Sequence, residues 1–165
     1  MQIKYYAELH CLSCFSFLRG VSQPAKLVEY AAKLNHAAIA ITDECSLAGA
    51  VKAHIAAKPL DIKLIIGSEF KLDNGMKLIA LAPNKLAYSE LSSLISLARR
   101  RCPKGEYRIY LKDIIFYLKQ CLIIWLPSQN NNLEYQYGHQ LKRLFHNRIW
   151  LGITRLLYCS KLNIL

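Results

Sequence analysis

Short apolar runs alternate with longer stretches of helical periodicity over the first hundred residues. Strands are predicted at residues 5–11, 37–42, 63–67 and 78–82. The second run is apolar almost throughout, which is typical of a strand buried on both faces. Helices are predicted to begin near Ser22, Ser46 and Asn84, because each is a residue type that caps helix N-termini.

The apolar residues of each predicted helix define the face expected to pack on a sheet. In the first helix, which has Pro24 in its first turn and Asn35 as its stop, they are Leu27, Val28, Ala31 and Leu34. In the second they are Leu47, Val51, His54 and Ile55. In the third they are Ala87, Leu91, Leu94, Ile95 and Ala98. On this pattern, His54 is expected at a packed boundary rather than in a binding site.

The second half of the chain continues the alternation with a weaker pattern. Helices are predicted at 110–119 and 133–145, and strands at 122–126 and 148–154. The sequence Asp73-Asn74-Gly75 indicates a hairpin turn between two earlier strands. Alternating strands and helices predict an α/β fold with a mostly parallel sheet, either barrel-like or open. The apolar end at residues 162–165 suggests an interrupted chain.

Composition narrows the class of protein. The chain has 165 residues, 53% hydrophobic and 20% charged, which fits one ordered domain with a real core. Its first residues do not open an apolar signal segment, and no run is long enough to span a bilayer. We therefore expect a cytoplasmic protein without membrane partners, whose six cysteines stay reduced.

Charge points toward polyanions. The formal net charge is +11, from 22 Lys and Arg against 11 Asp and Glu. Such a surplus favours nucleic acid as a partner, although basic charge also simply keeps a protein soluble. Arg99, Arg100, Arg101 and Lys104 cluster at the end of the third predicted helix and are the candidate DNA contacts.

Polar residues follow three of the predicted strands. They are His10 with Ser13, Asp43 with Glu44, and Ser68 with Glu69. In alternating α/β folds the carboxyl ends of strands gather binding sites, and imidazole with carboxylates suits a divalent metal that activates water. The alternative is that these residues serve turns and helix caps, and the spacing alone favours that alternative.

Two further patterns carry competing interpretations. Cys11 and Cys14 have C-x-x-C spacing, but a structural zinc site needs a second pair and a thioredoxin-like site needs a helix directly after the strand. Tyr107, Arg108 and Tyr110 mix aromatic and basic groups, as single-strand binding surfaces do. A half-buried edge of a strand or helix explains this second pattern better.

The strand ends carry motifs that resemble a known family. Residues 6–13 with 15–20, residues 40–49 and residues 62–70 resemble the three opening motifs of PHP domains in C-family DNA polymerases, which include the polymerase III alpha subunit. The residues of all three motifs are most similar to the error-prone branch, which is used in damage-induced mutagenesis. Residues 97–107 and 149–154 resemble that branch too. Three motifs in order are far more specific than one.

The resemblance implies a distorted TIM-like β/α barrel and, in metal-active members, a trinuclear centre with phosphoesterase or exonuclease chemistry. His10 matches the first histidine of a His-x-His pair, but Leu12 stands at the second. Glu69 matches a bridging glutamate. We expect no multinuclear manganese, zinc or magnesium centre and no catalytic residue, while weak binding of one ion at His10 and Glu69 stays open.

Other motif positions depart from the family pattern or keep its polar residues. Arg19 stands where an aspartate ligand is usual, and Glu44 follows Asp43 where a histidine is usual. Ser13 and Asp43 are the remaining polar motif positions. A salt bridge from Arg19 to Glu44 or Glu69 is predicted to act as structural glue in place of a metal.

The resemblance therefore predicts one partial PHP domain at 1–165, an incomplete barrel that lacks the polymerase palm, fingers and thumb. The parent function is DNA synthesis in replication, repair and translesion bypass, with DNA and other mutagenesis or replication proteins as partners. For the chain itself, a structural role or a truncated remnant is the first hypothesis. The alternatives are a stand-alone metal-dependent phosphoesterase or exonuclease, and a basic DNA-binding or assembly module.

Overall fold

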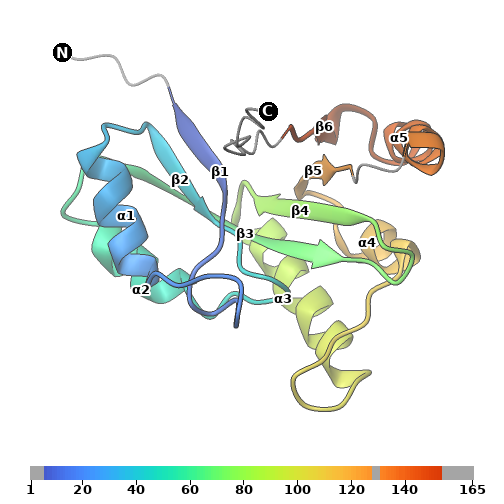
Figure 1. Cartoon of the computed structure of the whole chain (residues 1–165), viewed down its shortest axis with the longest axis horizontal. Helices are drawn as coiled ribbons and strands as arrows, with labels where there is room; N and C mark the ends of the chain where they lie inside the picture. Colours follow the sequence, from blue (N-terminus) through green and yellow to red (C-terminus); the bar gives the residue numbers. More distant parts are fainter. Residues whose placement is uncertain (1–5, 128–130, 154–165) are drawn as a thin grey trace, which may run out of the picture.

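The computed structural model describes residues 6–127 and 131–153 (Figure 1). In chain order its elements are β1 (Ala7–Cys11), α1 (Pro24–Lys33), β2 (Ala38–Ile41), α2 (Ala50–Ala57), β3 (Lys63–Lys71), β4 (Lys77–Ala82), α3 (Lys85–Arg100), α4 (Leu111–Tyr117), β5 (Leu122–Leu126), α5 (Asn131–Phe145), the short 3-10 turn η1 (His146–Arg148) and β6 (Ile149–Leu151). The predicted alternation of strands and helices is confirmed.

The strands form one sheet in the order β1-β2-β3-β4-β5-β6. β1, β2 and β3 are parallel, β4 is antiparallel to both β3 and β5, and β6 is parallel to β5. The reversal occurs at the predicted hairpin, where Gly75 has a φ of 87° and its N–H donates to the carbonyl of Leu72. Apart from β4 all strands run the same way, so the mostly parallel sheet is confirmed.

Helices cover one face of a curled sheet, and the opposite face is concave (Figure 1). Side chains alternate along β4: Leu78 and Ala80 pack toward the core that includes α3 and α4, whereas Ile79 and Leu81 point the other way. That second face lines an apolar groove of about 880 Å³. The sheet thus has the curvature of part of a barrel wall, with its apolar interior on the side away from these helices.

The start and the buried face predicted from the apolar pattern are correct for α3 and wrong for α2. α3 begins at the predicted cap, where the Asn84 side chain accepts from the Ala87 N–H, and its predicted stripe faces the core. α2 begins at Ala50 rather than near Ser46, because the Ser46 N–H donates to Ser68 Oγ in an irregular segment.

The late start changes the face that α2 buries. Its buried residues are Ala50, Ala53 and Ala57, whereas Val51, His54 and Ile55 are exposed, so the predicted stripe and the boundary position of His54 are wrong. Alanines allow α2 to lie close to its neighbours in a core shared with α1 and β2. In α1 the cap is Gln23 rather than Ser22, and Leu34 is exposed.

Gly67 marks a close approach of backbones in the middle of the sheet. A Cβ added there would lie 2.7 Å from the carbonyl oxygen of Ala80 on β4. We expect Gly67→Ala to lower the free energy of unfolding by about 2 kcal/mol, because a backbone atom cannot move aside without distorting the ladder. Urea unfolding measures this, with Lys63→Ala on the exposed end of β3 as the control. Equal midpoints for the two variants would contradict the expectation.

Candidate functional site

A buried carboxylate organises the segments that follow β1 and β2. Asp43 lies two residues after the end of β2 and is almost fully buried. It accepts three hydrogen bonds: from the Ser13 N–H at 2.7 Å, from Ser13 Oγ at 2.6 Å and from Ser16 Oγ at 2.7 Å. Ser16 Oγ in turn accepts from the Glu44 N–H. The polar residues at these strand ends therefore act first as a structural anchor, as the turn-and-cap alternative predicts.

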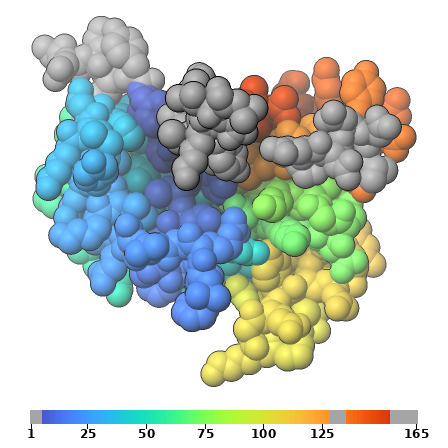
Figure 2. Space-filling view, in the orientation of Figure 1, coloured from blue at the N-terminus to red at the C-terminus, as the bar shows by residue number. Residues whose placement is uncertain are grey.

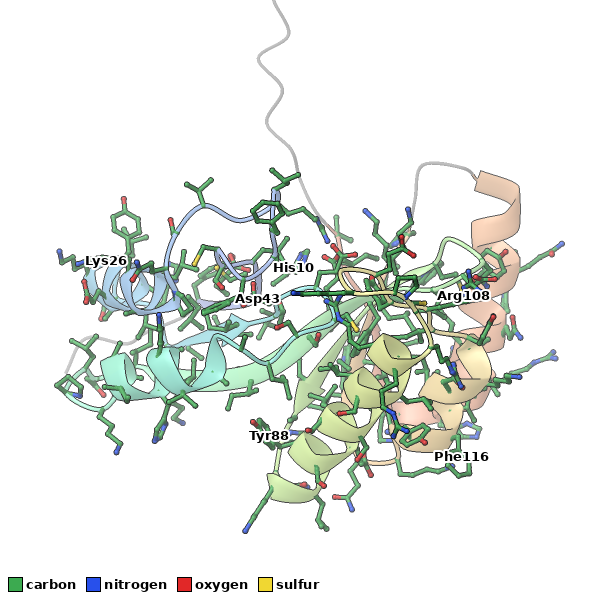
Figure 3. The ribbon with its side chains drawn as sticks, turned by 90° about the horizontal axis from the view of Figure 1, so that it is seen from below. His10, Lys26, Asp43, Tyr88, Arg108 and Phe116 are labelled. Atoms are coloured by element: carbon green, nitrogen blue, oxygen red, sulfur yellow. The ribbon has the colours of Figure 1, made fainter. Side chains whose placement is uncertain are left out.

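Arg19 lies at the centre of an ion-pair cluster at the same end of the sheet. Its Nη1 is 2.6 Å from Glu44 Oε2 and 2.6 Å from Glu69 Oε1, and its Nη2 is 3.3 Å from Glu69 Oε2. The predicted salt bridge is confirmed, and it reaches both carboxylates. Figure 3 shows His10 and Asp43 at this end of the sheet, away from Tyr88 and Phe116.

Glu69 is the most buried acid of the cluster and has two cationic or donor partners. Its side chain is 1% exposed, and His10 Nε2 donates to its Oε2 at 2.7 Å. Burial alone raises the pKa of Glu69, but the hydrogen bonds from His10 and Arg19 and the charge of Arg19 outweigh burial and lower the pKa to about 2. Glu69 is therefore a carboxylate held ionised by its neighbours.

Glu44 has a further hydrogen-bond partner, Tyr107, which the sequence alone did not identify. The Tyr107 hydroxyl donates to Glu44 Oε1 at 2.7 Å and accepts from the Lys71 N–H at 3.0 Å. Burial raises the pKa of Glu44, but the hydrogen bonds from Tyr107 and Arg19 outweigh that effect and lower it. Burial and the hydrogen bond to Glu44 both raise the pKa of Tyr107. Tyr107 lies 63 residues from Glu44 in the chain, so no local pattern signals the contact.

The four basic candidate DNA contacts do not share one environment. Arg99 stacks on the Tyr107 ring and donates to the carbonyls of Glu44 and Cys45, and Arg101 donates through both Nη atoms to Asp113. Arg100 and Lys104 are exposed, and within the described ranges their side chains make no ion pair or hydrogen bond. The structure therefore leaves those two open for a phosphate, while Arg99 and Arg101 serve the fold.

The residues present do not fit a multinuclear metal centre. Leu12 has no donor atom, and the Arg19 guanidinium already bridges the two carboxylates that face the site. Among residues 6–127 and 131–153, no three His, Cys, Asp or Glu side chains are arranged to hold a metal ion. Burial raises the pKa of the Cys11 thiol to about 11, so at neutral pH this cysteine lacks the thiolate that zinc or redox chemistry needs.

The low pKa of Glu69 makes stability depend on pH in acid. Its folded-state pKa of about 2 is below the ordinary 4.5, so between these values the unfolded chain binds more protons and stability falls as pH falls. The contribution of Glu69 to the free energy of unfolding is fully present above about pH 5.5. Between pH 7 and pH 3 we expect this contribution to fall by about 2 kcal/mol. Urea midpoints across this range, with Glu69→Gln as the control, test the expectation. Parallel pH profiles for the two proteins would show that Glu69 is not responsible.

The fold is that of a PHP domain. The PHP domain family model matches residues 8–142, and the chain belongs to that family. Its relatives include proteins named error-prone DNA polymerase, from Saccharophagus degradans (53% identical over 156 residues, 94% of this chain) and Teredinibacter turnerae (55% identical over 148 residues, 90% of this chain). The chain spans only 15% and 14% of the length of these two relatives.

Two solved structures share the fold. They are a putative metal-dependent phosphoesterase from Bifidobacterium adolescentis, with a TM-score of 0.62 at 16% identity, and an amidohydrolase from Chromobacterium violaceum, with a TM-score of 0.65 at 15% identity. The match covers 88% of this chain in both cases, but 75% and 76% of the solved chains. The predicted fold, an incomplete PHP-type barrel, is confirmed. No helix within the described ranges is long and apolar enough to cross a membrane.

Proposed function

We propose that this chain is the PHP unit of an error-prone DNA polymerase and that its role there is structural. The identity of about half of the residues over nine-tenths of the chain supports the parent protein. The observation that carries the structural role is Arg19, whose guanidinium bridges Glu44 and Glu69 at 2.6 Å. The ion pairs tie the loop after β1 to the ends of β2 and β3, which is the mechanical task that a bridging metal performs.

The structural role assigns no catalysis of phosphoester hydrolysis to the cluster. Both carboxylates are held ionised and paired with Arg19, so neither can protonate a leaving group, and His10 Nε2 is bonded to Glu69. The 165 residues are proposed to form a single PHP unit in the cytoplasm, and DNA synthesis belongs to the parent polymerase. A stand-alone phosphoesterase is the alternative that this arrangement disfavours.

Two experiments test the proposal. In the first, the matching segment of the Saccharophagus degradans polymerase is replaced by this chain, and primer extension is measured; we expect extension to be retained. A chimera that melts cooperatively but does not extend primers would refute the proposed parent function. In the second, the purified chain is titrated with manganese and zinc by calorimetry. Tight binding of two or more ions, or phosphatase turnover with manganese, would refute the structural role.

DNA contact by the parent polymerase is proposed to involve Arg100 and Lys104, since their charges are unpaired within the described ranges. Removing both by alanine substitution is expected to weaken single-stranded DNA binding and to reduce its salt dependence. The matched control is Lys58→Ala with Lys85→Ala, which removes two exposed charges elsewhere. If the two double variants lose the same DNA affinity, binding depends on the overall charge and not on Arg100 and Lys104.

A further inference from the structure

Three of the most exposed apolar side chains sit together on the loop between β1 and α1. Phe17 is 84% exposed, Leu18 91% and Val21 94%, and all three lie within five consecutive residues. In Figures 1 and 2 this dark-blue loop projects from the body of the molecule. Single exposed apolar residues are ordinary on a protein surface, but a group on one projecting segment marks an interaction surface.

This loop is held firmly in place, so the apolar group is presented in a fixed arrangement. The Cys14 N–H donates to the Ser22 carbonyl at 2.8 Å and closes residues 14–22 into a compact loop. Ser16 is bonded to the buried Asp43, and Arg19 is bonded to Glu44 and Glu69. Ser16 directly precedes Phe17, and Arg19 directly follows Leu18.

The loop also contains local strain. Leu18 has a φ of 61°, a left-handed conformation that disfavours residues with a side chain. Backbone strain of this kind persists where surrounding contacts enforce it and is concentrated at functional sites. Leu18 lies between two anchored residues, since Ser16 is bonded to Asp43 and Arg19 to Glu44 and Glu69. Within the described residues, Phe17 and Leu18 are left almost fully exposed.

We propose that the apolar tip, Phe17 with Leu18 and Val21, docks into an apolar recess on the remaining part of the polymerase chain to which this PHP unit belongs. The inference rests on the proposed function. The matched relatives carry about 85% of their length outside the segment that this chain covers, so a large protein surface is available in the same polypeptide. Preorganisation by the anchors lowers the entropy lost on docking.

The composition of the tip favours a protein partner over nucleic acid. Two of the three tip residues, Leu18 and Val21, are aliphatic, so only Phe17 offers an aromatic face on which a base can stack. The charge of Arg19 is already paired with Glu44 and Glu69, so it is not available for a phosphate. Lys52 Nζ lies 5.6 Å from the centre of the Phe15 ring and so places a positive charge beside the residue two positions before Phe17. The recess is therefore expected to be apolar with an acidic rim.

A matched pair of double variants tests the proposal. Phe17→Ser with Leu18→Ser alters the tip, and Phe116→Ser with Leu86→Ser removes one exposed Phe and one exposed Leu elsewhere. In the isolated chain we expect neither double variant to lower the urea midpoint, because these side chains are exposed. In the Saccharophagus degradans chimera we expect the tip variant to lower the melting temperature and the control variant to leave it unchanged.

Carbene footprinting measures docking directly. Labelling of Phe17 and Leu18 in the isolated chain is expected to be strong, and in the chimera to fall to the level of buried residues such as Leu91. Equal labelling of Phe17 and Leu18 in the isolated chain and the chimera would overturn the inference. If that chimera still extends primers, the proposed function stands.

If the labelling is equal in the two proteins and the tip variant also loses affinity for oligo(dT), the tip contacts DNA and the docking inference is wrong. A chimera that does not melt cooperatively would contradict the proposed function and the docking together.

Discussion

Replacing Arg19 by alanine is expected to lower the free energy of unfolding by about 3 kcal/mol at pH 7 and the melting temperature by roughly 8 °C. The variant leaves Glu69, which is 1% exposed, ionised and with only its hydrogen bond to His10, and it leaves Glu44 without its counter-charge. The cost is therefore dominated by the uncompensated buried carboxylate. The effect stays below that of a fully buried pair because Arg19 itself is 35% exposed.

Arg108→Ala is the matched control for Arg19. Its guanidinium lies 3.6 Å from Asp73, and both side chains are more than half exposed, so we expect a loss of less than about 1 kcal/mol. Adding Glu69→Gln to Arg19→Ala should recover part of the lost stability, because a neutral amide needs no counter-charge. Thermal and urea unfolding in the presence of a chelator measure all three proteins. If Arg19→Ala and Arg108→Ala unfold at the same urea concentration, Arg19 is not a structural substitute for a metal.

Replacing Asp43 by alanine is expected to have the largest effect, about 4 kcal/mol of unfolding free energy. The substitution removes the acceptor for the Ser13 N–H and for the hydroxyls of Ser13 and Ser16, all of them buried, and leaves a gap beside Gly49. Asp43→Asn keeps one carbonyl oxygen that accepts hydrogen bonds, so its loss should be about half as large.

The Asp43 prediction also has a local readout. Since Ser13 and Ser16 anchor the loop at residues 14–22, Asp43→Ala should increase cleavage there by chymotrypsin, which cuts after Phe17. Asp73→Ala, which removes an exposed carboxylate, serves as the control for both stability and cleavage. Cleavage at an unchanged rate, together with a urea midpoint close to that of the control, would show that the anchor contributes little.

Local pattern was sufficient for the elements whose neighbours along the chain fix their structure. The apolar run before Asp43 is a strand buried at every position, and the hairpin forms where Asp73, Asn74 and Gly75 place it. α3 begins directly after Asn84, because that side chain accepts a hydrogen bond from the first turn of the helix. In α2 the same kind of argument fails, because Ser46 bonds to Ser68 of a distant strand and the helix starts four residues later.

The sequence by itself determined the alternating α/β order, the surplus of positive charge and the motif positions, including the substitutions at Leu12, Arg19 and Glu44 that argue against a metal centre. Only the tertiary structure decided that Arg19 reaches both carboxylates and that Glu44 is also bonded by the Tyr107 hydroxyl and, at its carbonyl, by Arg99. It also decided that Phe17, Leu18 and Val21 are exposed. The physical reason is range. Helix caps and turns are satisfied by neighbours a few residues away, whereas a buried charge is satisfied by whatever partner the fold brings within about 3 Å, however far away it lies in the chain.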